Sequence, residues 1–381
     1  MVDDNTRPGG DRQPSRTAQS QQRQPGHGEN SSGDTGGSWL PGGLQWTPLT
    51  VLFALVLVGG AAAGVFVATG GEVPLLGSGR STTLDAVPEG VDMVMYADSG
   101  ILDDQTTATM VNGMLALSAQ TPSYAGPTSY SELTAEIRNE TDIGLDRFES
   151  ATVFATYPEG AATSPAYVGV IVNSEWSTSD LVQTIEENGQ PLQTRTYRGT
   201  TVYVRTASSQ PDTWLAPLGD GTFVMGTETA VTDAIDVNAG DMDAFSGPLK
   251  ESFTALRDGY VKFVTTMPRQ ATQQAGRFAV AGQVTQHVER VAGVYYASGR
   301  DVGITLTVTG PDQSGAESIK EGIEAGLSLA SMGAQDASIS NLLDAVKVSQ
   351  NGRDVTVTFE YAASDLVSVA EQFSNRSTLA A

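Results

Sequence analysis

Residues 46–69, WTPLTVLFALVLVGGAAAGVFVAT, decide how the rest of this 381-residue chain is organised. The run holds no charged side chain. As a helix its 24 residues would extend about 36 Å, at roughly 1.5 Å per residue, which is enough to cross a hydrocarbon layer of about 30 Å. Trp46 stands where an interfacial aromatic is expected, and Pro48 falls in the first turn, where a missing backbone N–H costs least. The run therefore predicts a transmembrane helix in contact with the lipid bilayer.

A cleaved signal peptide is the main alternative for this run, because small residues at 61–64 follow the apolar segment. Signal peptides begin with a short basic region, whereas 45 residues precede this run and none of residues 34–46 is Lys or Arg. We therefore expect an uncleaved signal anchor. Gly60 and Gly64 form a Gly-xxx-Gly pair, which would allow two such helices to pack as a homodimer.

The apolar run divides the chain into a tail, a linker and a folded domain. The tail is rich in Gly, Ser, Gln and Pro and has too few apolar residues to offset the entropy of ordering. It carries four Arg and five acidic residues, so it is nearly neutral. We expect a single-pass cell-membrane protein with a cytoplasmic N-terminus and an extracellular domain. The expected parts are a disordered tail at 1–45, a linker at 70–90, two halves of the domain at 91–240 and 247–374, and a flexible C-terminus at 375–381.

The net charge of the chain limits the classes of molecule that it can bind. The chain has 44 acidic and 21 basic residues, a net charge of -23. Residues 80–381 hold 38 acids and 17 bases, so 38 - 17 = 21 negative charges are in excess there. A nucleic acid is excluded as a partner, because its phosphates would be repelled. Self-repulsion of this size is screened at molar salt, where the Debye length is about 3 Å.

The amino-acid composition also excludes several kinds of catalytic and metal-binding site. There is no cysteine, which excludes disulfides, thiolate metal sites and cysteine nucleophiles, and the only histidines are His27 and His287. No phosphate-binding loop, nucleophile elbow or metalloprotease motif occurs, so we expect no cofactor and no catalytic residues. Asp241 and Asp243 are the best candidates for a loosely bound divalent cation, followed by the adjacent pair Asp103 and Asp104. Solvated loop carboxylates are the alternative for both pairs.

The domain opens with the strand-like run VDMVMYAD, and the periodicity after it alternates between helices and strands. In the first half we expect helices at 106–117, 130–138, 178–188 and 227–237, and strands at 91–98, 148–157, 166–173, 192–197, 201–205, 214–218 and 222–225. In the second half we expect strands at 259–265, 291–297, 302–308, 345–349 and 355–361, and helices at 269–288, 317–331 and 363–373. Turn signals at Arg198-Gly199 and Asn351-Gly352 predict hairpins.

The order of these elements repeats. Each half reads strand, helix, hairpin, helix, hairpin, helix, which predicts two tandem copies of one unit. An α+β domain without internal duplication is the alternative, because the halves share little sequence. Hairpins separated by helices favour an α+β fold of largely antiparallel sheets with helices packed on one face.

Three stretches of the domain follow a family pattern. VPEGVDMVMYAD after an anchor, the strand pair YRGTTVYV, and FVMGTETAVTDAIDV before the second half resemble uncharacterised single-pass proteins of halophilic archaea. The resemblance covers most of residues 85–381. It implies an acidic, halophilic protein at the cell membrane with an α+β domain, and it implies no activity.

We therefore expect a non-enzymatic, membrane-anchored module that binds a protein partner at the cell surface or serves the cell envelope. The alternative is an envelope hydrolase that uses carboxylates or a Ser/Lys pair, with Lys250 and Lys262 as the central lysines. Export would also make Asn139 and Asn375 candidates for glycosylation, because both begin N-x-Ser/Thr triplets. Asn30 begins a third triplet, but it lies in the tail and should stay bare.

Overall fold

A computed structural model describes residues 84–120, 124, 126–141, 144–156, 167–187, 191–206, 212–219, 221–267, 287–333 and 336–379. The expected membrane helix at 46–69, with Gly60 and Gly64, lies outside these residues, as do the tail and the linker up to residue 83. None of the helices in the described ranges combines the length and the apolar composition needed to cross a bilayer.

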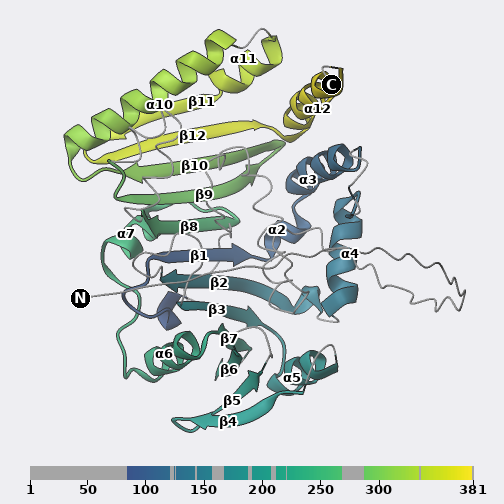
Figure 1. The fold of residues 1–381 in the computed structure, drawn as a ribbon, viewed down its shortest axis with the longest axis vertical. Helices are drawn as coiled ribbons and strands as arrows, with labels where there is room; N and C mark the ends of the chain where they lie inside the picture. Colours follow the sequence, from purple (N-terminus) through teal and green to yellow (C-terminus); the bar gives the residue numbers. More distant parts are fainter. Residues whose placement is uncertain are drawn as a thin grey trace, which may run out of the picture. The chain divides into compact units, whose positions relative to one another are not determined.

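The described strands form one twelve-stranded sheet in which every pairing is antiparallel (Figure 1). The strands are β1 (Met93–Asp98), β2 (Phe148–Thr156), β3 (Tyr167–Ser174), β4 (Gln193–Tyr197), β5 (Thr200–Arg205), β6 (Thr213–Gly219), β7 (Thr222–Gly226), β8 (Val261–Thr266), β9 (Arg290–Ser298), β10 (Asp301–Thr309), β11 (Val346–Asn351) and β12 (Asp354–Ala362). Their order across the sheet is β11-β12-β10-β9-β8-β1-β2-β3-β7-β6-β5-β4. The expected α+β class with antiparallel strands is confirmed.

The opening strands of the two halves, β1 and β8, lie side by side within the sheet. The remaining strands of the first half follow β1 on one side, and those of the second half follow β8 on the other. We expected more than one sheet, but the pairing of β1 with β8 joins both halves into a single one. The sheet therefore ends at β4 in the first half and at β11 in the second.

Helices cover both faces of the sheet, so the expectation of helices on one face is wrong. The helices are η1 (Leu84–Ala86), α2 (Gly100–Asp103), α3 (Gln105–Ser118), α4 (Tyr130–Thr141), η2 (Leu145–Arg147), α5 (Thr178–Glu187), α6 (Glu228–Ala239), α7 (Gly247–Ala255), α10 (Gln313–Gly333), α11 (Ala337–Asp344) and α12 (Ala363–Leu379). Side chains of α3, α5 and α12 join the apolar cluster on one face, and those of α6 and α7 join the cluster on the other.

The two clusters follow from the alternation of side chains along each strand. Met93 and Met95 of β1 point into the cluster with α3 and α5, whereas Val94 and Tyr96 point into the cluster with α6 and α7. Because most central strands are apolar at both alternating sets of positions, both faces need a covering layer. A regular alternation of half-buried and exposed side chains, as expected for a sheet covered on one face, occurs in β11.

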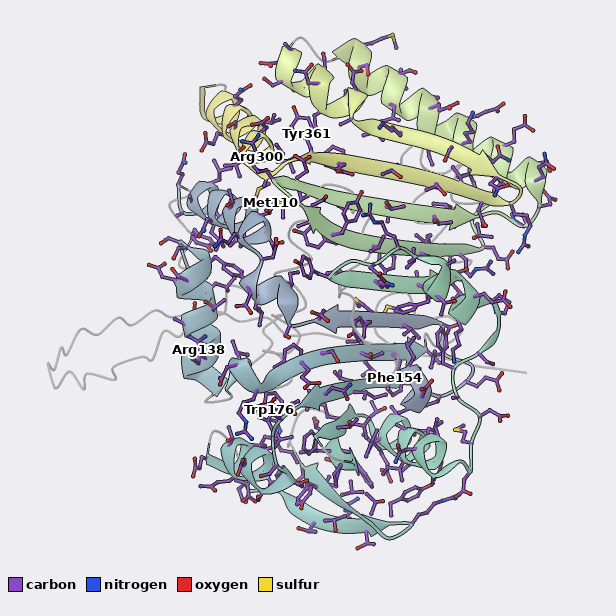
Figure 2. All side chains as sticks on the ribbon, turned by 180° about the vertical axis from the view of Figure 1, so that it is seen from behind. Met110, Arg138, Phe154, Trp176, Arg300 and Tyr361 are labelled. Atoms are coloured by element: carbon purple, nitrogen blue, oxygen red, sulfur yellow. The ribbon has the colours of Figure 1, made fainter. Side chains whose placement is uncertain are left out.

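The two halves also meet through helices α3 and α12. A Cβ atom added at Gly113 of α3 would lie 2.2 Å from Cγ2 of Val367 on α12, so the helices cross closely at this glycine. The N-terminal ends of both helices hold the β9–β10 turn, through a hydrogen bond from Thr106 Oγ1 to the Gly299 carbonyl (2.8 Å) and one from the Ala363 N–H to the Arg300 carbonyl (3.0 Å). Figure 2 shows Met110 of α3 and Arg300 at this end of the sheet.

Most of the expected elements are present within one to four residues of the expected bounds. The sequence interpretation missed α7 and α11, which are only nine and eight residues long. The C-terminal helix α12 extends to Leu379, six residues beyond the expected end at residue 373. Most of the helix expected at 269–288 lies outside the described residues.

Candidate functional site

The β4–β5 hairpin at the end of the sheet turns on two residues with positive φ. Arg198 has φ 45° and Gly199 has φ 86°, as in a two-residue type I′ turn. The turn expected at Arg198-Gly199 is thereby confirmed. The first position of such a turn favours Asn, Asp or Gly, because a larger side chain is strained at positive φ. Arg198 is the one non-glycine residue in the described part of the chain with positive φ, which suggests that its side chain is needed there.

The Arg198 side chain fixes the hairpin to the C-terminal end of α6. Its guanidinium forms ion pairs with Asp236, at 3.0 Å between Nε and Oδ1, and with Asp241. The neighbouring Tyr197 hydroxyl donates a hydrogen bond to Asp236 Oδ2 at 3.0 Å. Helix α6 ends at Ala239. The next residue, Gly240, has a φ of 79°, and the N–H of Asp241 after it donates a hydrogen bond to the Asp236 carbonyl at 2.8 Å. The hairpin is therefore held by charge and hydrogen bonds to α6 as well as by its pairing with β6.

The contact between Arg198 and Asp241 affects the cation site that we expected at Asp241 and Asp243. The Asp241 carboxylate is engaged by Arg198, which already supplies a positive charge. Asp243 is exposed, and its backbone carbonyl accepts a hydrogen bond from the Glu89 N–H at 3.1 Å. Within the described ranges, no group of three or more His, Cys, Asp or Glu residues could hold a metal ion.

The outer strand β4 is exposed along almost its whole length. Gln193, Thr194, Arg195 and Thr196 are all exposed, so neither face of the strand is covered there. The Arg195 guanidinium lies over the Trp214 ring of β6, with Cζ 5.2 Å from the ring centroid. Arg195 makes no ion pair with any described residue. In the described part of the sheet, β4 pairs with β5 on one side and leaves its other edge free.

The charge of this hairpin is opposite to that of the chain as a whole. Residues 188–211 contain three arginines, at 195, 198 and 205, and no acidic residue. The segment therefore carries +3 and the rest of the chain -26. Sequence reasoning did not single out Arg195 or Arg205, although the absence of Asp and Glu over 24 residues of so acidic a chain is visible in the sequence.

A second polar cluster lies where β1 meets α3, and it contains the other candidate pair, Asp103 and Asp104. Asp104 caps α3 by accepting the Thr107 N–H at 2.6 Å, and it also accepts a hydrogen bond from the Tyr260 hydroxyl at 3.3 Å. Burial, with Asp103 and Asp104 nearby, raises the pKa of Tyr130 to about 12. The Asp104 carboxylate therefore has a structural role at the start of α3.

Asp98, at the end of β1, belongs to the same cluster. It accepts the Gly100 N–H at 2.8 Å, and burial raises the pKa of its carboxyl group although this hydrogen bond opposes the shift. The hydroxyls of Thr107, on α3, and Tyr295, on β9, share a buried hydrogen bond of 2.7 Å. These side chains fix α3 to the sheet and hold no nucleophile next to a base.

The remaining candidates lie apart from one another. Lys262 of β8 contacts the Leu256 carbonyl at 3.4 Å and Asp258 at 3.5 Å, and Lys250 is half-buried on α7. His287 is exposed in the turn before β9, where we expected a helix residue. Asn139 and Asn375 lie within α4 and α12, although we expected both to follow the ends of helices.

Comparison with known proteins adds little. A scan against protein-family models and a search of curated proteins each found no match. Among solved structures, the chain is similar to crystal form III of TP0453, with 12% identity and a TM-score of 0.43 over 76% of this chain and 97% of that one. Crystal form I of TP0453 gives 12% identity and a TM-score of 0.41 over 77% of this chain and 98% of that one. Likeness of this extent does not indicate a function.

Proposed function

We propose that this protein is a single-pass, membrane-anchored binding module whose folded domain faces outward and recruits a protein partner at the free edge of β4. The charge-free run at 46–69 and the nearly neutral tail before it support the anchor and the orientation. A domain of this kind needs no reactive residues, because its task is to hold a partner.

The exposure of β4 is the observation that carries the proposal. An edge strand presents a row of backbone N–H and C=O groups that can pair with another chain. Proteins normally protect such an edge with a covering element, a bulge, a proline or charged residues. At the opposite end of the sheet, β11 lies against α10 and α11. The exposed strand β4 has a continuous register with β5, and Arg195 is its one charged residue.

A photo-crosslinking amino acid at Thr194 in intact cells tests the binding role. We expect a covalent adduct with a second protein, because Thr194 is exposed at the free edge. Thr254, which is exposed on α7, is the matched control and should give no adduct of the same mass. The same adduct from both positions, or none from Thr194, would refute the binding role of β4.

Protease added to intact cells tests the orientation separately. We expect cleavage within residues 84–379 and protection of residues 1–45. Cleavage of the tail with protection of the domain would reverse the proposed orientation.

We also infer that the two halves are copies of one unit. The element order β1-α3-β2-β3-α5 has its counterpart in β8-β9-β10-α10. In both halves the last hairpin, β6–β7 or β11–β12, returns to pair with the third strand of its half, β3 or β10. Duplication accounts for the central pairing of the two opening strands, β1 and β8. The first half has four strands after α5, so its additional hairpin, β4–β5, is the part that the second half lacks.

A further inference from the structure

We infer that the partner at β4 presents an acidic, extended polypeptide segment, which adds to the sheet as an antiparallel strand next to β4. This inference rests on the proposed binding function and specifies the chemistry of its partner. It is carried by the backbone groups that the hairpin leaves free and by the charge of the side chains around them.

The geometry of the turn identifies the free backbone groups. Tyr197 and Thr200 are paired directly across the two-residue turn, so they form the hydrogen-bonded pair that closes it. In an antiparallel ladder, hydrogen-bonded and non-hydrogen-bonded pairs alternate. Thr196 and Thr194 therefore occupy non-hydrogen-bonded positions and direct their N–H and C=O groups away from β5. An incoming strand would pair with these four groups.

The side chains near this edge select for negative charge. Arg195 lies between the two threonines, is exposed, and has an aromatic ring and no acid as its described contact. Arg205, at the end of β5, is half-buried and likewise makes no ion pair among the described residues. A carboxylate on the added strand could pair with Arg195 in a bidentate geometry. Such a contact pair is shorter than the Debye length of about 10 Å at 0.1 M salt, so salt at that concentration weakens it less than it weakens long-range steering.

The same charge argues against a second copy of this chain as the partner. In an antiparallel pairing of two β4 strands centred on Arg195, the two Arg195 side chains would lie directly opposite each other, about 5 Å apart. Like charges in that position destabilise a strand pair. Free backbone donors and acceptors also favour a polypeptide over a lipid surface, which could use only the arginines.

Two synthetic peptides test the inference on the full-length protein. The probes are the capped peptides TEVEVTE and TQVQVTQ, which differ only in carboxylate or amide side chains. We expect TEVEVTE to bind about tenfold or more tightly than TQVQVTQ, a difference of about 1.4 kcal/mol. Fluorescence anisotropy measures the affinities. Hydrogen exchange should show protection of the Thr194 and Thr196 amides when TEVEVTE is bound.

Variants of the protein distinguish the contribution of backbone hydrogen bonds to binding from the contribution of side-chain charge. Thr194→Pro removes an outward N–H and no ladder hydrogen bond, so it should abolish binding, whereas Thr194→Val should retain it. Arg195→Gln should reduce the preference for TEVEVTE to less than threefold. If Thr194→Pro does not fold, the comparison of the two peptides and the Arg195→Gln variant still test whether the partner segment is acidic.

Each contrary outcome has a distinct meaning. Equal binding of both peptides would overturn the acidic partner and leave β4 as a binding edge. An absence of binding by both peptides, while Thr194 still crosslinks to a protein in cells, would overturn the extended acidic segment but not the binding function. Binding of vesicles of phosphatidylcholine and phosphatidylglycerol through Arg195, without protection of the Thr194 amide, would overturn a polypeptide partner.

Discussion

Replacement of Gly113 by alanine tests the contact that joins the two halves through their helices. In an isolated helix this change would raise stability by about 1 kcal/mol, because glycine is a poor helix former. Here the new Cβ would lie 2.2 and 2.3 Å from the two γ-carbons of Val367 and 2.8 Å from its Cβ. Real contacts of this kind are never so short, so α3 and α12 would have to move apart.

The expected magnitude follows from these two opposing effects. Overpacking of a helix contact costs about 1–3 kcal/mol, so after the gain in helix propensity Gly113→Ala should lower the free energy of unfolding by about 1 kcal/mol. Val367→Gly removes all three crowding atoms. In that background Gly113→Ala should instead raise the free energy of unfolding by about 1 kcal/mol, so the double-mutant cycle should give a coupling of about 2 kcal/mol.

Equilibrium urea unfolding of the purified protein, followed by circular dichroism, measures these changes. Gly326 of α10 is the matched control, because a Cβ atom there would meet nothing within 4 Å. Gly326→Ala should be stabilising by up to about 1 kcal/mol. A stabilising effect of Gly113→Ala in the otherwise unchanged protein, equal to that of Gly326→Ala, would refute the close crossing of α3 and α12.

Further predictions concern the hairpin, the charge and the surface. Arg198→Ala should lower the urea midpoint more than Arg198→Gly. The alanine variant loses both ion pairs and keeps the strained φ of 45°, whereas the glycine variant loses only the ion pairs. Equal midpoints for the two variants would contradict this reasoning. Burial raises the pKa of Asp98 in the folded protein above 3.8, so ionisation of this carboxyl group opposes folding. The stability of Asp98→Asn relative to the unchanged protein should therefore increase as pH rises from 3 to 7. A stability difference that does not vary with pH would contradict the shift. The excess of acids predicts a melting temperature that falls as salt decreases from molar to tenths of molar, measured by circular dichroism, and a constant value would contradict a halophilic protein. Mass spectrometry of the native protein should find glycans only at Asn139 or Asn375, and a glycan at Asn30 would reverse the orientation.

The sequence predicted the identity of most elements because their signals are local. Amphipathic spacing marked α3 and α10, and the turn residues Arg198-Gly199 and Asn351-Gly352 marked hairpins whose glycines have positive φ. The acidic charge and the absence of cysteine likewise follow from composition alone. The prediction of a membrane helix is also local, because it depends only on 24 consecutive residues and not on the fold of the domain.

Only the tertiary structure decided which strands are neighbours and which side chains meet. The pairing of β1 with β8 joins residues about 170 positions apart, and no local pattern specifies such a pairing. The division of helices between two faces depends on both apolar sets of the central strands, which read in the sequence as uninterrupted hydrophobic runs. Arg198 with Asp241, and Gly113 with Val367, were likewise brought together by folding. The free edge of β4 arises because hydrogen bonding across a sheet is non-local: a strand becomes an edge only when the positions of all the others are known.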